Sequence, residues 1–259
     1  MKAVFKTVVP NKSIDLYVKN IMLFEKERNL YTSLPFFADG YPGLMFQQTE
    51  QRLVVYPYNK TMSTVFLYGQ TLNPISLEIF GTYRIIVFQL YPFVLKSLFD
   101  ILPNDIKDNC CDMTDFLKRI GTDFDSNLCN GMTTKELIES ITEIIILLAE
   151  RKTKSLDKNI VCAVKDIIES KGQKNIQSVI LKTSLSSRTF ERRFLAEIGL
   201  SAKHFAKIIQ FQSSMKQLSS KEYIKLTDIV YQNGFADQSH FIRSIKTFTG
   251  RTPKYFKNR

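Results

Sequence analysis

The sequence predicts an α+β protein of two domains, a β-rich N-terminal domain and an all-α C-terminal domain. Short segments rich in β-branched and aromatic residues fill residues 1–92, where Gly, Pro and Asn separate them. After residue 157, apolar residues recur at helical spacing to the end of the chain. A length of 259 residues, 44% of them hydrophobic, is sufficient for a core in each domain.

The N-terminal segments predict the strands of a small barrel or a sandwich. They are residues 44–46, 53–56, 64–68, 75–80 and 84–90. Regular spacing of short strands and turns is typical of both architectures. Aromatic residues of this region either line a pocket for a small-molecule effector or fill the core, and both interpretations are open. These residues are Tyr41, Tyr56, Tyr58, Phe66, Tyr68, Phe80 and Phe88.

Helices are expected to flank these strands. Pro92 stands at a helix start, residues 113–120 form one short helix, and Thr133 with Glu136 makes a capping-box pattern. The helix that follows carries an apolar seam at heptad spacing. The seam either pairs two protomers in a homodimer or packs on its own domain. It consists of Leu137, Ile141, Ile144 and Leu148.

Neither a metal site nor a cofactor site is expected. The four cysteines contain no CxxC pair, which argues against zinc or a disulfide framework and indicates a reducing cytoplasm. Both histidines, His204 and His240, fall in the C-terminal half, so residues 1–150 cannot supply a histidine-rich metal site. The adjacent Cys110 and Cys111 are interpreted as small buried hydrophobes, with a thiol sensor as the alternative.

The net charge of +11 is concentrated in the C-terminal part of the chain. Residues 1–150 carry 14 basic and 17 acidic side chains, a balance of −3, whereas residues 151–259 carry 22 and 8, a balance of +14. Such an excess predicts a polyanionic partner. The N-terminus lacks the apolar stretch of a secretory signal, and the apolar run at residues 85–95 is too short to cross a bilayer. We therefore expect a cytoplasmic protein with no membrane partner.

Beyond a charged boundary at residues 151–158, the chain predicts a helix-turn-helix unit. The domains are accordingly residues 1–152 and 157–259. Ser186 caps the unit's last helix, and Gly199 ends it. The unit's helices are residues 160–168, 176–182 and 186–198. The outer face of the last helix carries Ser187, Arg188, Glu191, Arg192 and Arg193.

Residues 226–256 predict a second unit of the same construction. Asn233-Gly234 ends its first helix because glycine takes the left-handed backbone of a helix exit. The next helix, residues 237–248, buries Phe241, Ile245 and Phe248 at i, i+4 and i+7. Amide and guanidinium groups on its outer face suit the major groove of double-stranded DNA. That face carries Gln238, Ser239, Ile242, Arg243 and Lys246.

A connecting helix over residues 202–218 separates the two units. Its length is about 25 Å at 1.5 Å per residue. Recognition helices at residues 186–198 and 237–248 are therefore expected to enter successive major grooves of one duplex, about 34 Å apart.

With both units in view, the C-terminal domain resembles the DNA-binding domain of the AraC/XylS family of bacterial transcriptional regulators. The stretches LSSRTFERRFLAEIGLSAKHF and LTDIVYQNGFADQSHFIRSIKTFTGRTPKYF carry the resemblance. It implies a sequence-specific transcription factor that recruits or obstructs RNA polymerase. The positions that read bases in the family fall on Arg188, Glu191, Arg192, Gln238, Ser239, Ile242 and Arg243.

This chain departs from the family pattern at two positions. Gln210 stands where the connecting helix of the family usually carries an arginine. Ile242 cannot hydrogen-bond a base, so it reads a thymine methyl group or only packs. Glu191 accepts a hydrogen bond from cytosine or clamps a neighbouring arginine, and Lys246 is expected to contact phosphate.

The N-terminal part resembles the small β-rich, cupin-like domain that precedes this DNA-binding unit in one branch of the family. Residues 35–40 (PFFADG), residues 67–70 (LYGQ), and Phe88 followed by Pro92 carry this resemblance. It implies a regulatory or dimerisation domain.

Two other functions remain open. A DNA-targeted enzyme would need an activated cysteine in its N-terminal domain, and Cys110, Cys111 and Cys129 have no histidine nearby in the sequence. No nucleophile elbow or phosphate loop appears, so we expect no catalytic residues and no enzymatic activity. A non-specific architectural DNA binder is the other alternative.

Overall fold

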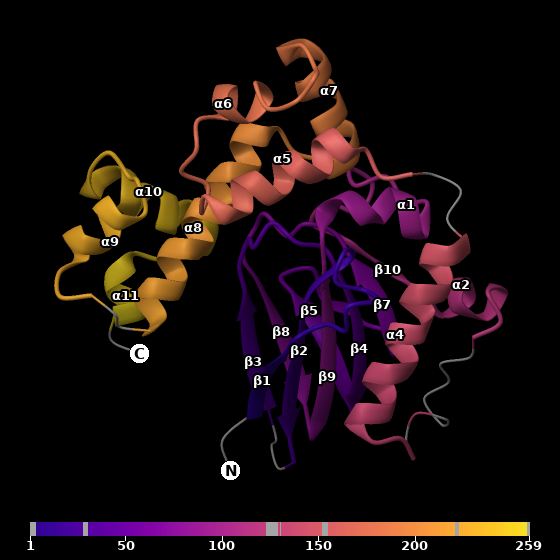
Figure 1. Cartoon of the computed structure of the whole chain (residues 1–259). Coiled ribbons are helices and arrows are strands. Elements are labelled where there is room, and N and C mark those ends of the chain that lie inside the picture. Colours follow the sequence, from indigo (N-terminus) through magenta and orange to yellow (C-terminus); the bar gives the residue numbers. More distant parts are fainter. Residues whose placement is uncertain are drawn as a thin grey trace. The chain divides into compact units, whose positions relative to one another are not determined.

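The computed structural model of the chain describes residues 4–27, 31–122, 129, 131–151, 155–220 and 223–257. The chain forms two compact units (Figure 1). One comprises Met1–Phe36, Tyr41–Thr71 and Ile75–Ser155, and the other Phe37–Gly40, Leu72–Pro74 and Leu156–Arg259. The first is rich in strands and the second is helical, which confirms the predicted α+β class. Residues 152–154 of the predicted boundary lie outside the described residues. In the described part of the chain, no helix combines the length and the apolar character that crossing a bilayer requires.

Two antiparallel sheets build the first unit. The six-stranded sheet has the order β1-β2-β9-β4-β7-β10, and the four-stranded sheet has the order β3-β8-β5-β6. The strands are β1 (Val4–Val8), β2 (Val18–Lys26), β3 (Tyr31–Phe36), β4 (Gly43–Thr49), β5 (Arg52–Tyr56), β6 (Lys60–Thr61), β7 (Val65–Tyr68), β8 (Ile75–Phe80), β9 (Tyr83–Leu90) and β10 (Cys110–Asp112). The five predicted strands correspond to β4, β5, β7, β8 and β9, whereas the sequence analysis missed the other five.

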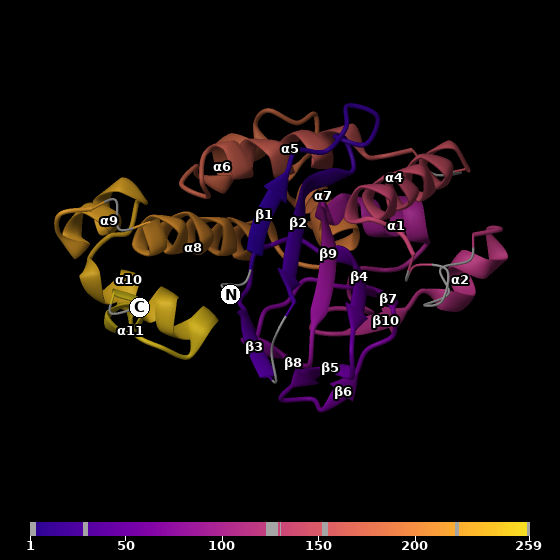
Figure 2. The same cartoon turned by 90° about the horizontal axis from the view of Figure 1, so that it is seen from below.

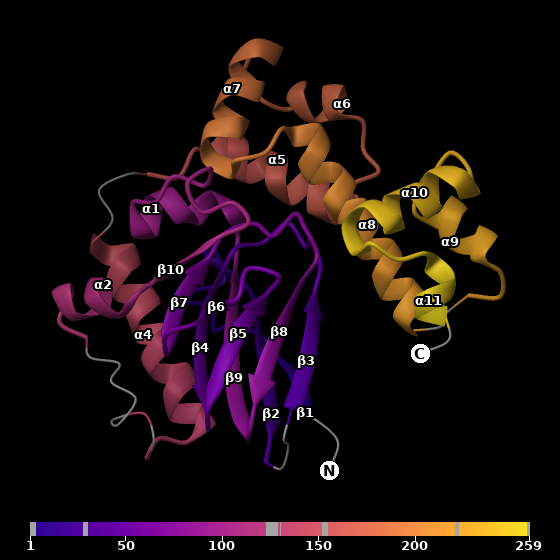
Figure 3. The same ribbon diagram turned by 180° about the vertical axis from the view of Figure 1, so that it is seen from behind.

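The core of this unit lies between the two sheets. Figures 1 and 3 show the two sheets from opposite sides. Alternation along each strand directs one set of side chains inward. Met45 and Val87 come from the six-stranded sheet, and Leu53 and Leu77 come from the four-stranded sheet. Strand β9 is buried at nearly every position, as expected for a central strand covered on both faces.

This unit also contains helices. They are η1 (Pro92–Val94), α1 (Leu95–Phe99), α2 (Thr114–Arg119) and α4 (Thr134–Arg151). The capping box of α4 forms as predicted, because Glu136 Oε2 accepts a hydrogen bond from the Thr133 amide at 2.7 Å and Thr133 Oγ1 accepts one from the Glu136 amide at 3.3 Å. The seam residues of α4 are between 0% and 5% exposed within this unit. The seam therefore packs on its own domain, and its use in pairing two protomers is wrong.

Seven helices make up the described part of the C-terminal domain. They are α5 (Lys158–Glu169), α6 (Ile176–Ile180), α7 (Ser187–Ile198), α8 (Ala202–Ser220), α9 (Leu226–Gln232), α10 (Gln238–Thr249) and α11 (Pro253–Lys257). Figure 2 shows α8 as the long helix that joins the α5–α7 group to the α9–α11 group.

Helix α8 contributes to the hydrophobic cores of both groups. Phe205 at its start packs on Phe194 of α7, with ring centroids 6.0 Å apart. Phe211, further along, packs on Phe248 of α10 at 4.8 Å. All four phenylalanines of α7 and α8, including Phe190, are fully buried. Because α8 is shared by the two cores, it is a structural part of each group and more than a spacer.

Candidate nucleic-acid interface

The first recognition helix, α7, is defined at both ends by local capping. The hydroxyl of Ser186 accepts a hydrogen bond from the Thr189 amide at 3.3 Å, so one free donor of the first turn is satisfied. Gly199 ends the helix with φ 79°, in the left-handed region that favours glycine. Phe190 and Phe194 hold the inner face in the core. The opposite face is consequently free to meet a ligand.

That outer face presents most of the residues that the sequence predicted. Ser187, Arg188 and Arg192 are exposed, whereas Glu191 is half-buried. In the described part of the chain, Glu191 makes no ion pair with either arginine, so the clamp considered for it is not formed. Arg193 differs from its neighbours, because its guanidinium forms an ion pair with the N-cap carboxylate of α5.

That ion pair joins Arg193 Nη1 to Asp157 Oδ2 at 3.2 Å. Asp157 also accepts a hydrogen bond from the Asn159 amide at 3.0 Å. The carboxylate thus caps α5 and holds α7 beside it. The sequence analysis assigned Arg193 to the outer face, and its partner is 36 residues away in the chain.

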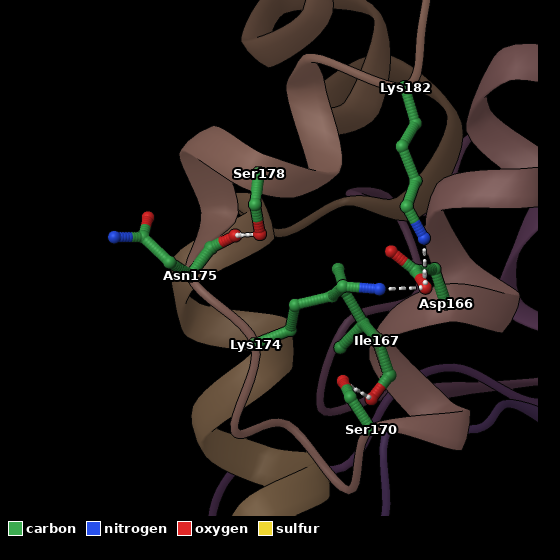
Figure 4. A network of polar contacts seen from close by, with 7 residues as sticks. All are labelled: Asp166, Ile167, Ser170, Lys174, Asn175, Ser178 and Lys182. Atoms are coloured by element: carbon green, nitrogen blue, oxygen red, sulfur yellow. Dashed lines mark hydrogen bonds and ion pairs between the residues drawn. The ribbon is translucent and has the colours of Figure 1, made fainter.

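A second polar cluster fixes α6 against α5 (Figure 4). One carboxylate oxygen of Asp166 accepts hydrogen bonds from Lys174 Nζ at 2.6 Å and from Lys182 Nζ at 3.0 Å. Burial by itself raises the pKa of Asp166, but these two hydrogen bonds outweigh it and hold the pKa below its ordinary value. Lys174 precedes α6 and Lys182 follows it, so both ends of the helix that supports α7 are held by Asp166.

The second recognition helix, α10, has the same construction as α7. Asp237 Oδ1 accepts a hydrogen bond from the His240 amide at 2.7 Å, and Gly250 ends the helix with φ 68°. The turn before α10 contains Gly234 at φ 70°, as the sequence predicted. All five predicted outer-face residues are exposed, and they are Gln238, Ser239, Ile242, Arg243 and Lys246.

Helix α8 is held against both helix-turn-helix units by contacts to backbone atoms. Gln210 Nε2 donates to the carbonyl oxygens of Asn233 at 2.9 Å and Gly234 at 3.1 Å, so it holds the turn before α10. Gly172, in the turn after α5, packs so closely on α8 that an added Cβ would lie 2.1 Å from the carbonyl oxygen of Ala206. Gln173 Nε2 donates to the carbonyl oxygen of Gln232 at 2.9 Å.

These bracing residues were missed as functional residues. Gln210 was noticed only because the resembled family has an arginine there. In this chain its amide makes hydrogen bonds inside the domain, which a family comparison alone does not reveal. The two recognition units are therefore held to one helix at several points, and their relative orientation is fixed within the domain.

Apart from Arg193, the exposed arginines of the two outer faces have no acidic partner in the described part of the chain. Within the described ranges, Arg188, Arg192 and Arg243 form no ion pair. A guanidinium group offers five N–H donors in a rigid fork, which matches phosphate oxygens and the O6 and N7 atoms of guanine. In the part of the chain that the structure describes, no group of three His, Cys, Asp or Glu side chains is placed to bind a metal ion.

The N-terminal domain contains a separate cavity of about 480 Å³ between its two sheets. Met45, Val55 and Leu77 form part of its apolar wall, and Lys60 and Lys107 lie at its polar side. Three of the seven aromatic candidates, Tyr58, Phe66 and Tyr68, line it. The other four, Tyr41, Tyr56, Phe80 and Phe88, do not line it. Tyr41 and Phe88 are buried elsewhere in the domain.

The two adjacent cysteines lie on β10 and face different surroundings. Cys110 lines the cavity with its Sγ 3.6 Å from the sulfur of Met62, whereas the Cys111 thiol is directed to the carbonyl oxygen of Leu67. Burial raises the pKa of both thiols. Both cysteines therefore stay protonated near neutral pH, which is unfavourable for an activated nucleophile.

Comparison with known proteins agrees with this organisation. Residues 181–259 match the family described as a helix-turn-helix domain, and residues 6–112 match a domain of unknown function (DUF6597). ToxT from Vibrio cholerae matches at 13% identity over 99% of this chain and 98% of its own, with a TM-score of 0.50. ToxT bound to (E)-4-(8-methylnaphthalen-1-yl)but-3-enoic acid matches at 13% identity over 99% of both chains, also with a TM-score of 0.50. The AraC-like transcriptional activator CuxR matches at 12% identity over 98% of this chain and 91% of its own, with a TM-score of 0.28. No curated protein sequence matches.

A β-rich domain followed by two helix-turn-helix units on one helix defines a DNA-binding transcription regulator. These findings support the predicted resemblance to the AraC family of these regulators. The C-terminal domain of the chain is an AraC-type helix-turn-helix domain, and the fold of the chain is the two-domain fold of ToxT.

Proposed function

We propose that the protein is a sequence-specific regulator that reads DNA with α7 and α10 in successive major grooves of one duplex. The observation that carries this proposal is the pair of capped helices with exposed arginine faces, both braced on α8. Helix α8 has 19 residues, and at 1.5 Å per residue it is about 28 Å long. That length is compatible with recognition helices one helical turn of DNA apart, about 34 Å.

The outer faces divide by chemistry into base readers and phosphate contacts. Arg188, Arg192 and Arg243 are suited to guanine, and Gln238 is suited to adenine, because their side chains form paired hydrogen bonds with those bases. Ile242 is 40% exposed and suits a thymine methyl group, and half-buried Glu191 suits a cytosine amino group. Ser239 can donate to or accept from a base edge, and the phosphate contacts are assigned to Ser187 and Lys246.

Regulation of transcription follows from a position on promoter DNA. Bound protein recruits or obstructs RNA polymerase, and it acts in the cytoplasm, where bacterial DNA is found. A homodimer would need a surface other than the α4 seam, because the seam is buried.

Selection of bound fragments from a random DNA library tests this proposal. We expect two conserved half-sites, and Arg188→Ala is expected to relax sequence preference in one of them. Arg243→Ala is expected to cost about 1–3 kcal/mol on the selected site and to leave non-specific binding nearly unchanged. Arg119→Ala in the N-terminal domain also removes an exposed arginine and is the matched control.

Two outcomes would revise the proposal. Equal losses on selected and random DNA would make Arg243 a phosphate contact. A selection that yields no shared sequence would support a non-specific architectural binder in place of a regulator with defined sites.

The cavity of the N-terminal domain supports a second function, the binding of a small-molecule effector. A volume of about 480 Å³ lies in the range of ligand pockets, roughly 300–1,000 Å³. Its wall is mainly apolar, and its charged side chains are Lys60, Lys107 and Asp108, which leave a balance of one positive charge. We infer that the effector is an apolar molecule with one carboxylate, which is also the chemistry of the naphthyl-butenoic acid bound to ToxT.

Calorimetry with that naphthyl-butenoic acid and its neutral amide tests the effector proposal. We expect the acid to bind more tightly than the amide, because only the acid gains from the two lysines. Lys107→Ala is expected to remove most of that difference, and Ile75→Trp, which fills the cavity from half-buried Ile75, is expected to abolish binding. Equal binding of the acid by wild type and Ile75→Trp would place the ligand elsewhere.

A further inference from the structure

A groove rich in nitrogen-bearing side chains lies between α8 and α10, and its volume is about 420 Å³. Helix α8 contributes Lys203, His204 and Lys207, and α10 contributes His240 and Arg243. None of the predicted DNA-reading positions on α7 belongs to it.

The groove arises from two helical faces that look toward each other. Lys203 and Lys207 are four residues apart on α8, and His240 and Arg243 are three residues apart on α10, so each pair shares one face of its helix. Phe248 closes the groove at its apolar side, where it packs on Phe211. This packing holds the two helices in place, so the groove has a fixed shape.

Its lining has the chemistry of an anion site. The lining contains lysine, arginine and imidazole nitrogens and the hydroxyls of Ser201, Ser244 and Thr247, but no carboxylate. Within the described ranges, Lys203, Lys207 and Arg243 form no ion pair, whereas the acids of this domain that do form ion pairs, Asp157 and Asp166, bind other residues.

The helix geometry adds to this positive charge. Lys203 and His204 lie in the first turn of α8, where the helix dipole favours anions, and the Ser201 hydroxyl caps the His204 amide at 3.2 Å. Tetrahedral oxyanions with several acceptor oxygens satisfy such a set of donors, and the lysine and arginine charges favour an anion over a neutral or cationic ligand. Phosphate is therefore the group that the groove fits.

The position of the groove identifies the source of that phosphate. Helix α7 ends at Ile198 and α8 begins at Ala202, so one wall of the groove directly follows the first recognition helix. The other wall is the second recognition helix itself. When both helices occupy major grooves of one duplex, the sugar-phosphate backbone between those grooves has to pass the start of α8.

We propose that the groove between α8 and α10 binds the phosphodiester backbone of DNA between the two half-sites. This inference rests on the proposed function. Lys203 and Lys207 bind backbone phosphates, and His204 and His240 donate further hydrogen bonds to the same backbone. Binding of the backbone in the groove sets the register of both recognition helices on the duplex.

The test is the salt dependence of DNA binding by full-length K203A/K207A. Each phosphate contact contributes about 0.9 to the slope of log K against log salt, so the double variant is expected to lower the slope by about 2 on selected and random DNA alike. Both lysines are exposed, so the fold is expected to be retained. Lys216→Ala is the matched control, because Lys216 is exposed on α8 about 180° around the helix from Lys207.

Ethylation interference locates the contacted phosphates. We expect modification of phosphates between the two half-sites to block wild-type binding and to have little effect on K203A/K207A. A wild-type slope and wild-type interference pattern in the double variant would overturn the proposal.

Inorganic phosphate separates DNA backbone from a free phosphate compound. Saturable phosphate binding by the DNA-free protein, lost in K203A/K207A while the DNA salt slope stays unchanged, would assign the groove to a free ligand and contradict the proposal. Failure of the proposed function can be told apart from failure of this inference. A protein without sequence preference would yield no selected site, but K203A/K207A would still lower the salt slope on random DNA.

Discussion

Asp166 connects both ends of α6 to α5 in the first helix-turn-helix unit. Its carboxylate is 17% exposed and binds a lysine at each end of α6 (Figure 4). The sequence placed Asp166 on an amphipathic helix but did not show that Lys174 and Lys182 meet there. Contacts over 8 and 16 residues depend on how the turns fold back, which local patterns do not encode.

Asp166→Asn is expected to lower the free energy of unfolding by about 1–2 kcal/mol, because the variant loses two charge-assisted hydrogen bonds. Chemical denaturation at pH 7 measures this change. Glu139→Gln is the control, since Glu139 pairs with Lys135 on an exposed helix face and its loss is expected to have little effect.

The contribution of Asp166 is also expected to depend on pH. Its folded-state pKa is lowered, so the stabilisation is fully present above the unfolded pKa of about 3.9 and is lost as the pH falls through the folded value. The difference in stability between wild type and Asp166→Asn should therefore shrink when denaturation is repeated near pH 3. A constant difference across this range would show that the charge of Asp166 is not its source.

At the scale of elements, the recognition helices were predictable because their signals are local. Ser186 and Gly199 cap α7 as the sequence indicated, Asp237 and Gly250 cap α10 in the same way, and the buried stripes follow helical spacing. The exposed faces follow directly from those stripes. Residues that brace the helices were not predictable, because Gln210 and Gly172 act through backbone groups of distant segments.

The missed strands are those with weak or mixed patterns. The side chains that the structure describes on β1 are exposed, and β1 is an edge strand, so no alternation marks it. Strand β3 contains Pro35, which is tolerated because β3 is the edge of the four-stranded sheet. The two-residue β6 and the three-residue β10 form by pairing with β5 and β7, and that pairing is not visible in a short segment.

The turn between α5 and α6 packs closely on α8 at Gly172, so substitution of this glycine is expected to destabilise the fold more than substitution of a glycine with open space around it. Gly172 and Gly250 both have positive φ, 72° and 68°, but only Gly172 would place a Cβ against backbone, 2.1 Å from the Ala206 carbonyl oxygen. Gly250→Ala is expected to cost about 1–2 kcal/mol from backbone strain alone. Gly172→Ala is expected to cost about 1–3 kcal/mol more, because α8 must move.

Thermal unfolding of both variants measures this difference. Similar losses in the two variants would show that α8 yields at little cost, and the rigid connection between the recognition units would then be wrong.

At the scale of the whole molecule, the chain combines a cavity-bearing β domain with a strongly basic helical domain. The sequence predicted this division from charge and pattern, and the resemblance to AraC/XylS regulators predicted the family. The lining of the cavity between the sheets was not predictable, because four of its seven aromatic candidates lie outside it. The groove between α8 and α10 was likewise hidden, since its walls come from segments about 35 residues apart in the chain.

The central claim is that α7 and α10 read two half-sites at a spacing fixed by α8. Footprinting on a selected site and on versions with 5 or 10 base pairs inserted between the half-sites tests it most directly. We expect two protected half-sites about 10 base pairs apart on the native site and loss of joint protection with either insertion, because the braced α8 cannot lengthen. Joint protection that survives either insertion would contradict a rigid two-helix reader.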